Sequence, residues 1–293
     1  MNLLHMLSQP VWRSRPTSAL KRDMLISLLS LAWVVEARDP YTGGHLWRVS
    51  QYANLLASRA GLTPLQTAQV TIGGFLHDLG KVSVPDAILR KADKLDDHEY
   101  AIIKTHPDVG KNVLLRHPLG ELVVDAVYSH HERPDGNGYP RGIQSRDIPE
   151  MAKIVGICDA FDAMTSARPY RPPMSADRAL GIIKANLGTQ FDSRFGEIFL
   201  ALGHTPEMHH IIGHSDEGIP LRHCASCGPT IVVRRRAIER SKAFCPACGG
   251  GYVLKGGNLD AVSAGVVGAA ADLEPIPDND LIERIATKNA AFF

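Results

Sequence analysis

The sequence has 293 residues, of which 44% are hydrophobic and 22% are charged, and its formal net charge is +1. These values are typical of a soluble globular protein that can bury a core, and the length suits one ordinary domain with a small appendage. The longest apolar stretch, residues 24–35, is interrupted by Ser27 and Ser30 and is too short to cross a bilayer. The basic N-terminus lacks an apolar segment ending in a small-residue cleavage site, so we expect a cytoplasmic protein with no secretory signal and no membrane partner.

Helical periodicity runs almost without a break from about residue 18 to residue 203. Hydrophobic residues recur three and four positions apart within 25–35 and within 49–60, which is the spacing of one helix face. Thr63 and Pro64 provide an N-cap and a first-position proline for the next helix. Further helices are expected near 120–131, 149–166, 175–187 and 192–202. The predicted fold class is therefore mainly α, a helical bundle.

Changes in composition divide the chain into five segments. We expect an N-terminal segment (1–17), a helical domain (18–205), a linker (206–219), a cysteine-containing module with a short strand (220–256) and a flexible tail with a short terminal helix (257–293). Inside the helical domain, residues 132–148 form a loop rich in Gly, Pro, Asp and Arg. A loop of this length in a compact domain is usually functional or disordered.

Several histidines and aspartates fall on the apolar faces of the predicted helices. His45, His130 and Asp159 each lie in register with hydrophobic residues of their own helix. The adjacent pair His77 and Asp78 is weak evidence alone, because such a pair at a helix end is often a capping or surface feature. Buried polar groups need partners, and imidazoles and carboxylates directed into one core are most simply satisfied by metal ions.

The candidate ligands form a set of five histidines and two aspartates. They are His45, His77, Asp78, His106, His130, His131 and Asp159. Seven ligands are too many for one ion but suit two, because the two oxygens of Asp78 can bridge ions roughly 3.5–4 Å apart. Imidazole with carboxylate suits iron or manganese, and the sequence leaves open which of the two binds.

The same residues stand in a motif series that resembles a known family. The series is His45, His77-Asp78-x-x-Lys81, His106, His130-His131-Glu132, Asp135-Gly-Asn-Gly-Tyr-Pro140 and Asp159. It resembles the HD-GYP subgroup of the HD-domain metal-dependent phosphohydrolases. Residues 37–45 and 168–171 support the match, which covers about residues 18–205.

The resemblance implies an all-helical HD domain with a dinuclear, sometimes trinuclear, metal site. It implies hydrolysis of cyclic di-GMP to pGpG and/or GMP by in-line attack of a metal-bridging hydroxide. One ion would be held by His45, His77, Asp78 and Asp159, and the other by Asp78, His106, His130 and His131. Members with three metals have a glutamate four residues before the first histidine, where this sequence has Tyr41. A phenol is a poor ligand, so we predict two ions.

The resemblance and the chemistry also indicate residues that act on the substrate. Gly138, Tyr139 and Pro140 would form the signature loop, which lies beside the site and is offered to substrate and to protein partners. Arg168 and Arg171 match positions that contact substrate phosphates, and Asp78 and Lys81 are the predicted catalytic residues. Lys81 could neutralise a phosphate oxygen, or it could only pair with Asp162. The two arginines could instead only cap or solvate their loop.

Four of the five cysteines form two C-x-x-C pairs separated by 17 residues. The pairs are Cys224 with Cys227 and Cys245 with Cys248. This spacing is a strong zinc-ribbon signal, so a small C-terminal β module with one zinc ion is expected. The basic run at residues 234–236 could attract an acidic protein surface or, less strongly, nucleic acid, or it could be a solvated face.

Three functions are compatible with these patterns. The first is an active metal-dependent phosphodiesterase for cyclic di-GMP, which the complete ligand set favours. The second is a cyclic-dinucleotide-responsive binding or scaffold module with little turnover. The third is a phosphodiesterase for another cyclic nucleotide, which would need the same metals and different contacts to the bases.

Overall fold

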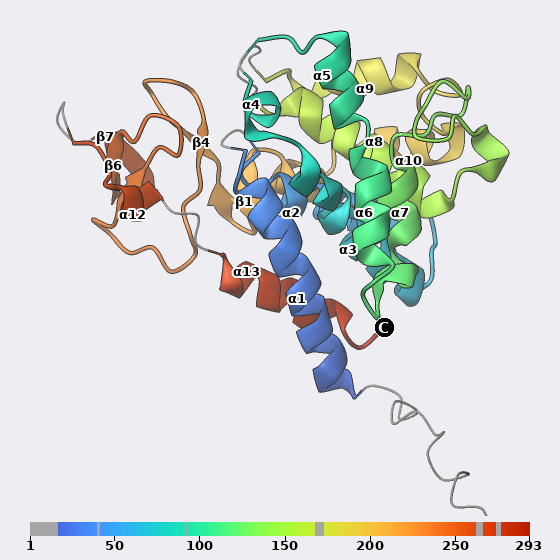
Figure 1. Cartoon of the computed structure of the whole chain (residues 1–293), viewed down its shortest axis with the longest axis horizontal. Helices are drawn as coiled ribbons and strands as arrows, with labels where there is room; N and C mark the ends of the chain where they lie inside the picture. The colour runs from blue at the N-terminus through green and yellow to red at the C-terminus, as the bar shows by residue number, and fades with distance from the viewer. Residues whose placement is uncertain (1–16, 40–41, 92, 168–172, 262–265, 274–276) are drawn as a thin grey trace, which may run out of the picture.

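The computed structural model describes the chain except for residues 1–16, 40–41, 92, 168–172, 262–265 and 274–276. A large helical body is joined to a small module of short antiparallel strands near the C-terminus (Figure 1). The predicted fold class, a mainly α domain with a small C-terminal β module, is confirmed.

The helical body is built from short and medium helices. These are α1 (Ser18–Glu36), α2 (His45–Arg59), α3 (Pro64–Leu76), α4 (Asp86–Leu89), α5 (Asp97–Ile103), α6 (His106–Leu114), α7 (Val124–Ser129), α8 (Glu150–Thr165), α9 (Ala176–Ala185), α10 (Ser193–Leu202) and α11 (Pro206–Ile211). Short 3-10 turns are η2 (Leu79–Ser83), η3 (Gly120–Leu122) and η4 (Ser145–Asp147). Two more helices, α12 (Ala270–Leu273) and α13 (Asn279–Asn289), follow the strands.

Helix α3 lies at the centre of the body, where it packs against α2, α7 and α8. The close approach of α3 to α7 and α2 depends on small residues at the contacts. A Cβ at Gly73 would lie 2.5 Å from the Cβ of Ala126 on α7, and one at Gly74 would lie 3.3 Å from the Cα of Ser50 on α2. This packing brings the C-terminal end of α3 beside the N-terminal end of α2.

The stretch predicted as a linker, residues 206–219, is folded. It forms α11 and a hairpin of β1 (His214–Asp216) and β2 (Ile219–Pro220). Met208 and Ile211 are buried in the main core, and Ser215 and Asp216 are also buried. The polar composition of the segment concealed these few anchoring residues, which are enough to hold it against α2.

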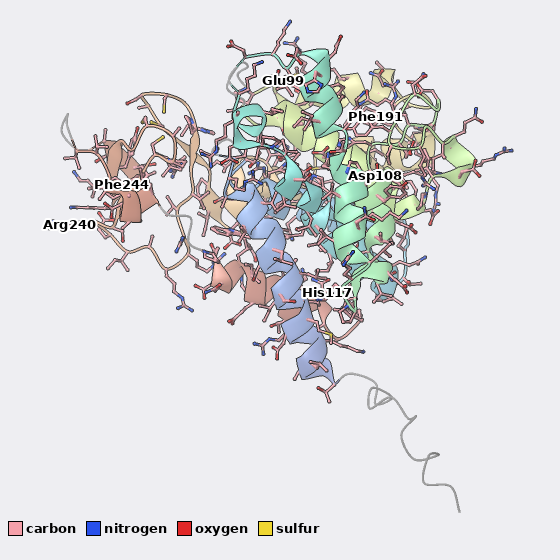
Figure 2. All side chains as sticks on the ribbon, in the orientation of Figure 1. Glu99, Asp108, His117, Phe191, Arg240 and Phe244 are labelled. Atoms are coloured by element: carbon pink, nitrogen blue, oxygen red, sulfur yellow. The ribbon has the colours of Figure 1, made fainter. Side chains whose placement is uncertain are left out.

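The cysteine module contains two small sheets. Strand β3 (Arg222–His223) pairs with β4 (Thr230–Ile231), and the second sheet has the order β5 (Lys242–Phe244), β6 (Gly251–Lys255), β7 (Asn258–Ala261). Its small core consists of Cys224, Ile231, Cys245 and Tyr252. Arg240 and Phe244, labelled in Figure 2, lie on this module, away from the helical body that carries Asp108 and Phe191.

The tail predicted as flexible contributes to both parts of the structure. Strand β7 completes the second sheet beyond the predicted boundary at residue 256, and α13 packs against α1 (Figure 1). The expected short terminal helix is α13, and its Leu281, Ile282 and Ile285 are buried in the main core. The prediction that this tail is flexible is therefore wrong for the described part of residues 257–293. Among the residues described, no helix is long and apolar enough to cross a membrane.

Candidate metal centre and active site

Two groups of three side chains could each hold a metal ion. The first group is His45, His77 and Asp78, and the second is His106, His130 and His131. Within each group the ligand atoms lie within 4.8 Å of one another. Every one of these residues stands at or just beyond a helix end, so the packing of these helices brings them together.

The carboxylate of Asp78 lies between the two groups. Its Oδ2 is 3.4 Å from Nε2 of His77 and 3.7 Å from Nε2 of His45, whereas its Oδ1 is 3.6 Å from Nε2 of His106. Asp159, on α8, joins the first group, with Oδ1 3.5 Å from Nε2 of His45. One carboxylate therefore has an oxygen on each side, as a bridging ligand requires.

Backbone carbonyls orient the imidazoles of both groups. Nδ1 donates a hydrogen bond to the carbonyl three residues earlier in His77 (to Gly74, 2.7 Å), His106 (to Ile103, 2.8 Å) and His130 (to Val127, 2.9 Å). A neutral imidazole has a proton on one nitrogen only, so when these rings are neutral each Nε2 is left with its lone pair. These lone pairs are directed into the site, which is the arrangement that metal-binding histidines have.

Pairs of Nε2 atoms face each other at short distances. Nε2 of His45 is 3.2 Å from Nε2 of His77, and Nε2 of His106 is 3.3 Å from Nε2 of His130. Two lone pairs at this distance repel unless a proton or a cation lies near both. The donor set of nitrogen and carboxylate oxygen therefore fits divalent ions.

The pKa values of the histidines differ between the groups. Burial lowers the pKa of His106 to about 4, and burial with the neighbouring His106 lowers that of His131 to about 3. Burial also opposes charge on His77, but the carboxylates of Asp78 and Asp159 outweigh it and raise its pKa to about 10. Without a metal, the second group is neutral and the first holds a proton where a cation would be bound.

Lys81 lies one turn beyond the aspartate that separates the groups. Its Nζ donates to Oδ2 of Asp78 at 2.6 Å. Burial opposes ionisation of Asp78, but Lys81 and His77 hold the pKa of that carboxyl well below its usual range. The alternative partner considered for Lys81, Asp162, binds Arg48 and His45 through its two oxygens.

Sequence reasoning missed the buried pair of Arg48 and Asp162. Nε of Arg48 donates to Oδ1 of Asp162 at 2.6 Å and Nη2 donates to Oδ2 at 3.0 Å. Oδ2 also accepts the Nδ1 proton of His45 at 2.8 Å. Arg48 and Asp162 stand three residues after His45 and Asp159, on the same helix faces as these ligands. This spacing is the sequence feature that could have indicated that Arg48 and Asp162 lie beside the candidate ligands.

Glu36 is a second missed residue near the first group. Its Oε1 accepts from the backbone N of Leu46 at 2.9 Å, in the first turn of α2, whose N-cap Gly44 has no side chain. Burial raises the pKa of Glu36 to about 7. A small pocket lined by residues that include Glu36, His45 and Lys81 lies at this place.

Tyr139 of the signature loop lies on the second group of ligands. Its ring stacks on the ring of His131, with centroids 4.6 Å apart and an interplanar angle of 26°. A Cβ at Gly138 would lie 2.4 Å from the backbone N of Arg133, so glycine is needed there. The peptide bond between Tyr139 and Pro140 is cis. The loop therefore lies beside the site, as expected.

Glu132 holds the far side of the same loop. Its Oε1 accepts from the backbone N of Arg141 at 2.8 Å, and its Oε2 accepts from the backbone N of Ile143 at 3.0 Å. The glutamate is buried, and the residue before it is the candidate ligand His131. Glu132 thus connects the ligand position to the loop that carries Tyr139.

Comparison with known proteins gives the family of the helical body. A model of the HD domain matches residues 30–195, which is more than half of the chain. The chain belongs to the HD-domain family. This membership implies a divalent metal site built from His and Asp clusters, and the two groups of ligands agree with it.

Curated relatives resemble this HD domain at 35–39% identity. They include a 3'3'-cGAMP-specific phosphodiesterase of Vibrio cholerae, 35% identical over 63% of this chain and 40% of its own length. The cyclic di-GMP phosphodiesterase response regulator RpfG of Xanthomonas campestris is 39% identical over 57% of this chain and 45% of its own length. A cyclic di-GMP phosphodiesterase of Thermotoga maritima is 36% identical over 61% and 50%. The chain thus matches half or less of the length of these relatives.

One similar solved structure is that of a cyclic GMP-AMP specific phosphodiesterase from V. cholerae. It has a TM-score of 0.48 and 19% identity, over 64% of this chain and 50% of that chain. The sequence-based recognition of an HD-GYP-type HD domain followed by a cysteine module is confirmed by the family match, the curated relatives and the cysteine cluster.

The four cysteines outside the HD domain also form a group that could hold a metal. Their Sγ atoms lie 3.5 Å apart for Cys227 and Cys245 and 3.6 Å apart for Cys224 and Cys248. Four thiolates at about 2.3 Å from a tetrahedral zinc ion would be separated by about 3.8 Å. The geometry therefore suits a tetrahedral ion. The phenol of Tyr252 donates to Sγ of Cys224 at 3.1 Å and orients it.

Some predicted site residues cannot be compared with the structure. Arg168 and Arg171, the predicted phosphate contacts, lie outside the residues that the structure describes, as does Tyr41. The roles of these three residues remain predictions.

Proposed function

We propose that this HD domain is a metal-dependent phosphodiesterase that hydrolyses cyclic di-GMP to pGpG and/or GMP. The observation that supports it most strongly is the position of Asp78, whose two oxygens face two separate groups of histidines. The names of curated relatives with the same HD domain point to the same class of reaction.

The proposed metal ligands follow from the two groups. His45, His77, Asp78 and Asp159 would hold one ion, and Asp78, His106, His130 and His131 would hold the other. Iron or manganese suits this mixture of imidazole and carboxylate. When bound, two such ions supply Lewis acidity to the phosphoryl group and an activated water for in-line attack.

The side chains around the ions have their own roles in this proposal. In the second group burial keeps the imidazoles neutral, so their Nε2 atoms are free to bind an ion, whereas an ion in the first group would displace the proton that His77 holds without metal. Lys81, held by Asp78 at 2.6 Å, would neutralise a non-bridging phosphate oxygen. Tyr139, stacked on His131, would contact a base or sugar of the substrate, while Arg168 and Arg171 would contact its phosphates.

The cysteine module is proposed to hold one zinc ion through Cys224, Cys227, Cys245 and Cys248. The signature loop or this module would also offer a surface to a protein partner, and nucleic acid is a weaker candidate. We place the domain boundary of the phosphodiesterase at about residues 18–205 and the protein in the cytoplasm.

A second candidate substrate is 3'3'-cGAMP. Relatives named for this nucleotide are as similar to the chain, at 35–37% identity, as some relatives named for cyclic di-GMP. The metal ligands would be the same for both substrates, because the reaction occurs at phosphorus. Discrimination would depend on contacts to the bases.

The test is product chromatography after incubation of anaerobically purified protein with each cyclic dinucleotide. Wild type should form pGpG or GMP, and Asp78→Asn should form neither, because one neutral amide cannot bridge two ions. Asp125→Asn, an exposed position on α7, is the matched control and should act as wild type. Bound but uncleaved nucleotide in a metal-loaded wild type would overturn the enzyme and favour a binding or scaffold module.

A further inference from the structure

The part of the chain that follows the HD domain, from residue 206 on and here called the C-terminal segment, packs on the turn that begins α2. A Cβ at Gly44, the N-cap of α2, would lie 2.6 Å from the Cα of Ser215 in β1. A Cβ at Gly43 would lie 2.7 Å from Cγ2 of Val232, in the cysteine module. His45, the first candidate ligand, is the next residue in the chain. Segments from two places beyond the HD domain therefore pack on the turn before a metal ligand.

The side chain of Arg48 connects the C-terminal segment to the candidate metal ligand His45. It is 2% exposed, and its five N–H groups all have acceptors. Nε and Nη2 donate to Asp162, Nη2 also donates to Oγ of Ser166 (3.1 Å), and Nη1 donates to the carbonyls of Gly43 (3.2 Å) and His214 (2.9 Å). A buried guanidinium with every donor used has one orientation only. One of the acceptors that define it, the His214 carbonyl, belongs to the C-terminal segment.

Asp162 links Arg48 to the candidate ligand His45 by hydrogen bonds. Its side chain is buried, and its Oδ2 accepts from both Nη2 of Arg48 and Nδ1 of His45. A hydrogen bond at Nδ1 sets the tautomer and the ring plane of a metal-binding histidine. His45 lacks the carbonyl partner that three other histidines of the site use, so it depends on this carboxylate.

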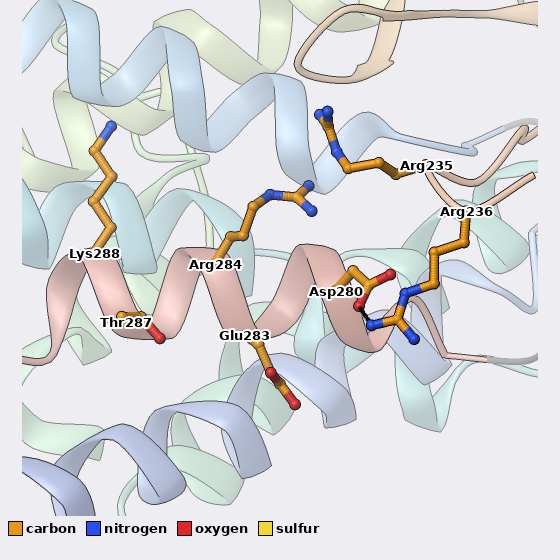
Figure 3. Close-up of a pocket in the computed structure, with 7 residues that line it drawn as sticks. All are labelled: Arg235, Arg236, Asp280, Glu283, Arg284, Thr287 and Lys288. Carbon is orange, nitrogen blue, oxygen red and sulfur yellow. Dashed lines mark hydrogen bonds and ion pairs between the residues drawn. The ribbon is translucent and has the colours of Figure 1, made fainter.

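The strand that offers the His214 carbonyl is itself held from two sides. The carboxylate of Asp216 is 4% exposed and accepts hydrogen bonds from Arg235, in the cysteine module, and Arg284, on α13. Figure 3 shows the side chains of Arg235 and Arg284 converging from these two elements, next to the pair of Arg236 and Asp280. The module and the terminal helix thus fix β1 against α2.

We propose that Arg48 is a positioning residue for the metal ligand His45, acting through Asp162, and that the C-terminal segment holds Arg48 in place through the His214 carbonyl and Asp216. This inference rests on the proposed function, because it assigns His45 to the first metal ion. It gives the C-terminal segment a part in the metal centre of the HD domain.

Arg48→Lys and Asp216→Asn test the two halves of the proposal. Lysine keeps the charge but has one point donor group in place of a planar fork, so Asp162 and the His214 carbonyl cannot both be held. Loss of an orienting partner costs about 10–100-fold in metal affinity. We expect such a loss for Arg48→Lys and a smaller, several-fold loss for Asp216→Asn. Asp280→Asn, which removes a more exposed Arg–Asp pair at the same junction, is the control and should bind as wild type.

The measurement is titration of metal-free full-length protein with Mn²⁺, followed by electron paramagnetic resonance, with circular dichroism to check the fold. Arg48→Lys should lose one Mn²⁺ and keep the one at His106, His130 and His131, a pattern that general unfolding would not produce. Wild-type affinity in Arg48→Lys, or loss of both ions together, would overturn the positioning role. Wild-type affinity in Asp216→Asn would overturn the role of the C-terminal segment.

The outcome for the wild type separates this inference from the proposed function. If wild type binds two Mn²⁺ but hydrolyses no cyclic dinucleotide, the proposed phosphodiesterase activity is wrong. The comparison of Mn²⁺ affinity between wild type and Arg48→Lys then still tests the positioning role. Wild type that binds no Mn²⁺ overturns both.

Discussion

Glu132→Gln is the substitution that tests most directly how the signature loop is held. The buried carboxylate accepts one backbone N–H with each oxygen, from Arg141 and Ile143. Glutamine keeps one acceptor and turns an NH₂ group toward the second N–H, so one charge-assisted hydrogen bond is lost and two donors face each other. A hydrogen bond to a charged group contributes about 1.5–3 kcal/mol, and we expect the free energy of unfolding to fall by about 2–3 kcal/mol.

Thermal unfolding followed by circular dichroism measures this loss. For a domain of this size the expected decrease in Tm is about 4–12 °C. Because the same loop carries Tyr139, hydrolysis of cyclic di-GMP should slow by about 10–100-fold, the cost of a small displacement near reacting groups. Glu150→Gln removes the same charge from an exposed pair with Arg194 and should change stability by less than about 1 kcal/mol. A Glu132→Gln protein that melts with the wild type would refute this account of the loop.

Three further perturbations have defined outcomes. Gly80→Ala would place a Cβ 1.8 Å from the carbonyl oxygen of His106, so it should destabilise the protein by at least about 1–3 kcal/mol in chemical denaturation and lower its metal content, whereas Gly181→Ala, with open space around it, should be neutral or slightly stabilising. Cys245→Ser should abolish zinc binding and hydrogen-exchange protection in β5 and β6 while the HD-domain helices stay protected, and retained protection would contradict a structural zinc. In chelated protein, unfolding frees His106 and His131 (pKa about 4 and about 3) to bind protons, so their contribution to stability should fall as pH decreases from about 6.5 toward 4. His77, with a pKa raised to about 10, should add stability below about pH 6.5 that is lost as pH rises toward 10, and a flat pH profile of the chelated protein would contradict both shifts.

The helical body and the ligand groups could be predicted because both follow from short-range patterns. A helix buries every third or fourth residue, so His45, His130 and Asp159 could be assigned to buried faces from their hydrophobic neighbours. The order of the motifs, through the resemblance to the HD-GYP subgroup, then assigned His77, Asp78 and the remaining histidines to one site. In the structure these residues do form two adjacent groups.

The partners of the buried charges could not be predicted from one sequence. Arg48 and Asp162 are 114 residues apart, and although their spacing from His45 and Asp159 places each beside a ligand, it does not indicate that they pair with each other. The docking of α11 and α13 was missed for a similar reason. Each helix is short and polar overall, and only a few side chains, such as Met208 and Ile285, anchor it in the main core. Their burial depends on surfaces presented by distant parts of the chain.

The most direct test of the central claim is elemental analysis of anaerobically purified wild type and Asp78→Asn. The account predicts about two iron or manganese ions per wild-type chain, with about one zinc ion in the cysteine module. Asp78→Asn should lose iron or manganese and keep its zinc, because the two sites share no ligand. Wild type that contains zinc alone, or Asp78→Asn that keeps its full iron or manganese, would contradict a dinuclear centre bridged by Asp78.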